Sequence, residues 1–94
     1  MKREIVELIE RTVREQFAGV KIESVGVSED TDYDGEMVYR VRVVFDQKGP
    51  LDSHKTSAIA RHLRHKLVAR QENAFPIVAF VSKSDAMGQK AAAA

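Results

Sequence analysis

Three aspartates at alternate positions, followed by a glycine, are the residues whose spacing most directly suggests chemistry. They are Asp30, Asp32 and Asp34 in the stretch DTDYDG, residues 30–35. A D-x-D-x-D-G loop can offer three carboxylates to calcium, with the glycine at the sharp bend. The twelfth position of such a loop, which needs a bidentate Glu, is Val41. Because strands flank the stretch where an EF-hand needs helices, we expect a hairpin loop with no calcium.

A basic segment is the second candidate. Between Ser53 and Gln71 there is no acid, and the segment carries five Lys and Arg residues and three histidines. Such a helix face can bind the phosphates of RNA or of another polyanion. The candidate polyanion site combines four cations of this segment with two arginines from residues 37–46: Lys55, Arg61, Arg64, Lys66, Arg40 and Arg42. The overall net charge of +1 does not indicate a dedicated nucleic-acid binder. His62 and His65 could share a metal, but the surrounding cations repel one, so we expect surface histidines.

Motifs of catalysis and of cofactor binding do not occur in the sequence. The chain has no cysteine, which excludes disulfides, thiolate nucleophiles and cysteine-based metal sites. No serine lies in a G-x-S-x-G elbow, and no Walker or dinucleotide-binding glycine pattern is present. We therefore predict that the protein is not an enzyme and has no cofactor.

The elements that must position these residues follow from the hydrophobic periodicity. Residues 2–18 have the pattern of an amphipathic helix, with Gly19 expected to end it in the left-handed conformation. Alternation predicts strands over 20–27, with a bulge at Ser24-Val25, and over 37–46. A second helix is expected from a cap at Asp52 or Ser53 to about residue 70, and a third strand over 75–81.

The resulting order is α-β-β-α-β, which predicts an α+β domain with a three-stranded mixed sheet and two helices packed on one face. Strands one and two form a hairpin, and strand three runs parallel to strand two. Two sheet orders, 2-1-3 and 1-2-3, satisfy this topology, and both place strand three at an edge. The order resembles that of KH-type RNA-binding domains, which implies a nucleic-acid surface on the basic helix. The resemblance covers topology only, because no G-x-x-G loop occurs in the chain.

The third strand is the most apolar segment of the chain. An uncovered apolar edge strand favours aggregation unless something covers it, and a second copy of the protein could do so, edge to edge or face to face. We therefore predict a small protein-interaction module, a homodimer or a binder of another protein, with RNA or polyanion binding as the alternative. The predicted self-association residues are Phe75, Ile77, Val78, Phe80 and Val81.

Length and composition predict one domain over residues 1–84 and a disordered tail over 85–94. No apolar run approaches the ~20 residues of a membrane span. The first ten residues mix charges into their apolar pattern and do not resemble a secretion signal. A cytoplasmic location without membrane contact is the expectation that follows.

Overall fold

The computed structural model describes residues 2–87, and its first element is helix α1, Arg3–Gln16. Its apolar stripe, which includes Ile5, Ile9 and Val13, is buried against the sheet. The helix ends two residues before the predicted end, with Phe17 as its C-cap. The expectation for Gly19 is wrong, because its φ is not positive. The Phe17 ring is itself buried in the core, which turns the chain toward the sheet before the glycine is reached.

Strands β1, Lys21–Thr31, and β2, Met37–Asp46, form the predicted antiparallel hairpin. β1 is four residues longer at its end than the sequence pattern predicts, and the loop between the strands is correspondingly short. The bulge is at Glu23 rather than at Ser24-Val25, because Ile22 pairs with Phe45 and Ser24 pairs with Val44. Two consecutive polar residues, Glu23 and Ser24, therefore mark the point where the alternation slips.

Helix α2, Ser53–Ala69, begins at the predicted cap. One carboxylate oxygen of Asp52 accepts hydrogen bonds from the backbone N–H groups of His54, at 2.9 Å, and Lys55, at 3.4 Å. The buried stripe of the helix is Ile59, Leu63 and Leu67, which lie three and four residues apart. Because only this stripe is buried, the other faces of α2 point away from the core.

Strand β3, Phe75–Ser82, is parallel to β2, and the sheet order is β1-β2-β3. The structure thus confirms that β3 lies at an edge, and it selects the order 1-2-3. A short helical turn, residues 83–87, follows β3 directly. Of the predicted tail, Asp85 to Met87 belong to this turn, and the Asp85 N–H donates to the Ser82 hydroxyl at its start. The rest of the predicted tail, 88–94, lies outside the described residues.

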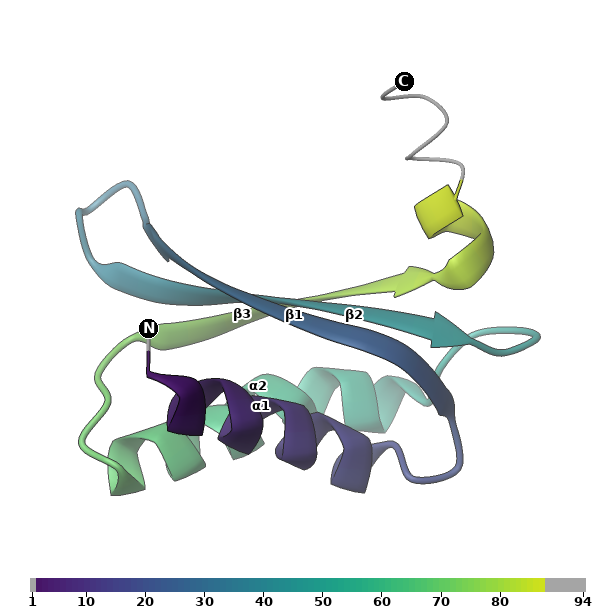
Figure 1. Ribbon diagram of the computed structural model, residues 1–94, viewed down its shortest axis with the longest axis horizontal. Helices are drawn as coiled ribbons and strands as arrows, with labels where there is room; N and C mark the ends of the chain where they lie inside the picture. Colours follow the sequence, from purple (N-terminus) through teal and green to yellow (C-terminus); the bar gives the residue numbers. More distant parts are fainter. Residues whose placement is uncertain (1, 88–94) are drawn as a thin grey trace.

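Both helices lie on one face of the sheet, as predicted, and the opposite face carries no helix layer (Figure 1). The core lies between these two layers and contains the four inward residues of β2, Tyr39, Val41, Val43 and Phe45. We call the opposite side the open face. The hairpin loop rises above it at one end and the 83–87 turn at the other (Figure 1). Over residues 2–87, neither helix has the length and apolar character needed to cross a bilayer.

Candidate functional site

The aspartates of the DTDYDG stretch make different contacts and do not converge. Asp32 closes the hairpin loop: one of its carboxylate oxygens accepts from the N–H groups of Asp34 and Glu36, each at 2.9 Å. Its own N–H donates to the Glu36 carbonyl, also at 2.9 Å, and Gly35 takes a positive φ of 78°. The stretch therefore forms a hairpin loop in which the Asp32 carboxylate holds the backbone turn.

Asp30 belongs to β1, not to the loop, and its carboxylate pairs with Arg40 on β2. The Arg40 Nε lies 2.6 Å from Asp30 Oδ2. This charge-assisted hydrogen bond, followed by one from the Thr31 N–H, holds the pKa of Asp30 below its ordinary value. Within residues 2–87, no three acidic or histidine side chains gather as a metal site would need.

The predicted polyanion residues divide between two opposite surfaces. Arg40 and Arg42 project from β2 onto the open face, where alternation places them away from the core residues Tyr39 and Val41. The four helical residues project from α2, on the other side of the sheet. A single ligand therefore cannot contact both groups without spanning the whole domain.

Two of the four helical cations are engaged within the molecule. The Lys66 Nζ lies 3.8 Å from a Glu15 carboxylate oxygen on α1. An Arg64 nitrogen donates to the Asn73 carbonyl at 2.9 Å, and the guanidinium lies over the Phe75 ring, 5.5 Å from its centroid. The other two, Lys55 and Arg61, are exposed, and their side chains make no hydrogen bond or ion pair within residues 2–87.

The residues predicted for self-association also divide by face. Ile77 and Val81 lie on the open face, in line with Arg40 and Val44 of β2, whereas Phe75 is the first residue of the edge strand and the Arg64 guanidinium of α2 lies over its ring. Ile77 is 40% exposed on the open face, and Phe75 is 52% exposed at the start of the strand. Val78 and Phe80 instead point toward the helices, where the Phe80 ring centroid lies 5.3 Å from that of Phe17.

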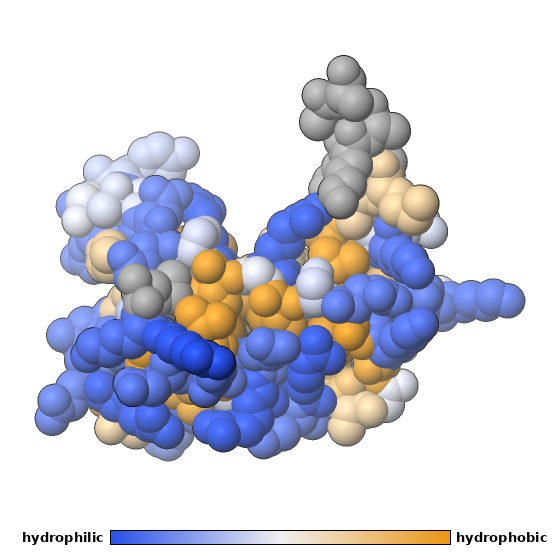
Figure 2. Space-filling view, viewed as in Figure 1, coloured by the Kyte–Doolittle hydropathy of each residue, from blue (hydrophilic) through white to orange (hydrophobic). Residues whose placement is uncertain are grey.

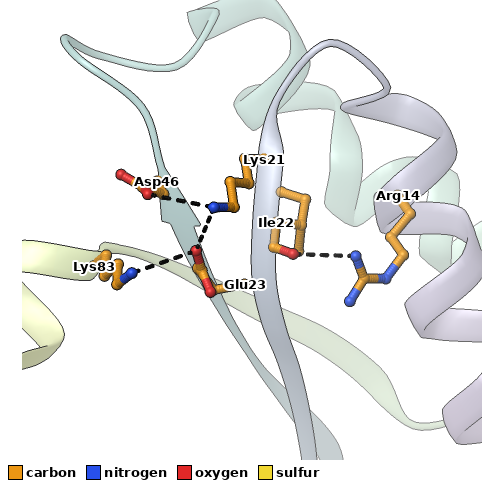
Figure 3. A network of polar contacts seen from close by, with 6 residues as sticks. All are labelled: Arg14, Lys21, Ile22, Glu23, Asp46 and Lys83. Atoms are coloured by element: carbon orange, nitrogen blue, oxygen red, sulfur yellow. Dashed lines mark hydrogen bonds and ion pairs between the residues drawn. The ribbon is translucent and has the colours of Figure 1, made fainter.

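An ion-pair network closes the end of the sheet where β2 and β3 finish (Figure 3). Glu23, the bulged residue of β1, lies between two lysines, with one carboxylate oxygen 3.5 Å from Lys21 Nζ and 3.7 Å from Lys83 Nζ. Lys21 also lies 3.9 Å from Asp46 of β2. The bulge therefore places a carboxylate where it meets cations from β1 and from the start of the 83–87 turn.

The open face is hollowed between the raised hairpin loop and the 83–87 turn, and hydrophobic surface is visible in this hollow (Figure 2). Three residues of adjacent strands, Gly26, Arg42 and Ala79, lie side by side at the hollow. Sequence reasoning identified only Arg42, because nothing in the order of residues shows that Gly26 and Ala79 flank it. The strand register is the signal that brings the three together.

Comparisons with known proteins add no further assignment. The chain matches no protein-family model, and no curated protein or solved structure is significantly similar to it.

Proposed function

We propose that this protein is a small, non-enzymatic interaction module that self-associates through β3. The observation that supports this most is the difference between the two edges of its sheet. The β1 edge carries charged side chains, including Lys21 and Asp30, and is interrupted by the bulge at Glu23. Charges and bulges are the features by which proteins prevent edge strands from pairing with other chains.

The β3 edge has almost none of this protection. Its eight residues carry no charge, and within residues 2–87 no segment forms strand hydrogen bonds with its outer side. Pro76, which lacks an N–H, and the Arg64 side chain restrict only its first residues. The segment from Ile77 to Val81 remains free to pair, and its centre is Ala79.

A two-fold antiparallel pairing centred on Ala79 fits this segment, because it places Ile77 of each copy beside Val81 of the other on the open face. Helix α2, which packs against β3, also allows this pairing. Arg64 shows which flank of α2 faces the β3 edge, and Ala60 and Ser57, four and seven residues earlier, lie on that flank. Both are small, so a second α2 can lie alongside.

Closure of one open face on another is less favourable. It would remove Arg40 and Arg42 and their symmetry mates from water in the middle of the interface, and charges buried this way cost several kcal/mol each unless they are well paired. Edge pairing leaves both arginines in solvent. We therefore propose that the dimer contains one continuous six-stranded sheet.

The size of this contact sets the expected affinity. An eight-residue strand is about 26 Å long, and the two layers together are roughly 20 Å deep, so each copy would bury about 500 Å². Stable complexes bury about 800 Å² per partner. The proposed dimer is therefore weak and dependent on protein concentration.

Cysteine cross-linking tests the proposal directly, because the natural chain has no cysteine. In the proposed register Ala79→Cys meets its own symmetry mate and forms a disulfide-linked dimer under mild oxidation. Arg42→Cys, in the middle of the open face, is the matched variant that cross-links only if faces close on each other. Cross-linking of Arg42→Cys without Ala79→Cys, or of neither variant, contradicts edge pairing.

Polyanion binding by α2 is a second candidate, and it is supported by the exposure of Lys55 and Arg61 without partners in the described chain. Each phosphate contact releases counterions and makes binding weaker as salt rises. A gel shift with single-stranded RNA should then show binding at low salt that Lys55→Gln and Arg61→Gln together remove. The absence of binding by the natural chain at low salt would exclude this function.

A further inference from the structure

The hollow on the open face has the size and composition of a small-molecule site. We call it the open-face groove: a mostly apolar depression of about 490 Å³ whose main lining residues are Gly26, Ser28, Arg40, Arg42, Ile77 and Ala79. Sites for small ligands have volumes of about 300–1,000 Å³ and combine apolar walls with a few polar groups. The groove meets both criteria.

The groove exists because small residues from the outer strands meet a long residue from the central strand. Gly26 of β1 and Ala79 of β3 pair on either side of Arg42. Neither carries a side chain that could cover the sheet there. One row further along the strands, Ser28 and Ile77 flank Arg40 in the same way. The floor of the groove is therefore apolar on the β3 side, where Ile77 and Ala79 lie, and is covered by little side chain on the β1 side, where Gly26 and Ser28 lie.

The two charged side chains that line the groove are both basic. Arg40 and Arg42 lie two residues apart on the same face of β2 and both line the groove. Asp30 pairs with the Nε of Arg40, but a guanidinium carries five N–H donors in all, so one contact does not exhaust it. Guanidinium groups bind carboxylates and phosphates through paired hydrogen bonds. An anionic group placed here would also have an apolar surface within reach.

We infer that the open-face groove binds a small amphiphilic anion. An apolar chain or ring lies on Ile77 and Ala79, and a carboxylate or phosphate is held by Arg42 together with Arg40. The ligand is a free molecule rather than a lipid in a bilayer, because the hairpin loop and the 83–87 turn rise on either side and keep a flat membrane from the floor (Figure 2). The inference does not rest on self-association, since edge pairing leaves the open face uncovered.

Octanoate, with octanol as its neutral counterpart, provides the test. Titration of the isotope-labelled full chain, followed by the backbone amide resonances, should shift Gly26, Ser28 and Ala79 first. Octanoate should bind with a dissociation constant on the order of 1 mM, the range expected for a ligand of this size. Arg42→Gln should weaken octanoate binding about tenfold and leave octanol unchanged, because only the anion loses a charge-assisted hydrogen bond.

Filling the groove gives a second, steric test with a matched control. At Gly26 an added Cβ would lie 4.0 Å from its nearest neighbour, the Arg42 carbonyl oxygen, so Gly26→Leu is accommodated by the backbone and occupies the groove. Gly19→Leu adds the same side chain where nothing lies within 4 Å, away from the groove. Ala79→Leu fills the groove from the opposite strand, should Gly26→Leu fold poorly.

Both filling variants should abolish binding of octanoate and octanol, while Gly19→Leu should bind as the natural chain does. Asp30→Asn should tighten octanoate binding severalfold, because it removes the anion that competes for Arg40. Three results would each overturn the inference: shifts that do not centre on the groove, unchanged binding by Ala79→Leu, or equal loss of octanoate and octanol in Arg42→Gln. Binding to anionic vesicles but not to octanoate would overturn the assignment to a free ligand.

Discussion

Replacement of Ile77 by threonine should weaken the dimer without unfolding the protomer. Threonine keeps the β-branched shape that strands favour, and Ile77 is 40% exposed in the single chain, so little intramolecular packing is lost. In the proposed register each Ile77 meets Val81 of the other copy, and the two-fold axis makes two such pairs. Cross-strand pairs contribute roughly 0.2–1 kcal/mol each, so the loss is about 1 kcal/mol per dimer, or about fivefold in the dissociation constant.

Sedimentation equilibrium over a range of concentrations measures that constant. Met37→Thr is the matched control: Met37 is exposed to a similar degree but lies on β2, where it pairs with Thr31 of β1 and is not part of the β3 edge. We expect Met37→Thr to dimerise as the natural chain does and Ile77→Thr to need about five times the concentration. Equal dissociation constants for the two variants would refute the assignment of the interface to β3.

Three further predictions concern the fold that carries these surfaces. Burial, with the hydrogen bond to Glu72, raises the pKa of Tyr39 to about 12, so the folded chain keeps a proton that the unfolded chain loses above about pH 10. The resulting stability is present below pH 10 and is lost as pH rises toward 12. Urea titrations should show the natural chain losing about 1.4 kcal/mol more than Tyr39→Phe between about pH 9 and pH 11, and parallel losses would contradict the shift. Asp52→Ala removes the cap of α2 and should cost about 1 kcal/mol in the same assay, whereas a cost near zero would mean that the cap is replaced by water. Leu63→Ala leaves a cavity under the sheet and should cost about 3–5 kcal/mol, and a loss below about 1 kcal/mol would show that the core collapses around it.

Most of the fold could be predicted because the periodicity of each element is strong. The exceptions are at positions where tertiary packing, and not the local sequence pattern, determines the structure. The sequence pattern predicts that Gly19 ends α1, but Phe17 turns into the core first. The sequence pattern does not distinguish the two sheet orders, because both bury the same faces. A signal for 1-2-3 was present in β2, where Val38 and Val44 add apolar side chains on the second face, as suits a central strand flanked on both sides.

The candidate sites were harder to predict because they depend on which residues share a surface. The predicted polyanion site groups Arg40 and Arg42 with the cations of α2, although alternation alone places them on the face opposite the core and so opposite the helices. Predicting the open-face groove from the sequence would require still more information. Gly26 and Ala79 are 53 positions apart in the numbering, and only the register of three strands places them on either side of Arg42.

Pairing of β3 with β3 of a second copy is the central claim, and intermolecular contacts measured by isotope-filtered NMR test it most directly. In a mixture of labelled and unlabelled chains at high concentration, edge pairing predicts cross-peaks from Ala79 to Ala79 and from Ile77 to Val81 across the two copies. Cross-peaks between Arg42 and the open face of the other copy, or no intermolecular cross-peaks where the measured mass is that of a dimer, would contradict it. A monomeric mass at every concentration would contradict self-association itself.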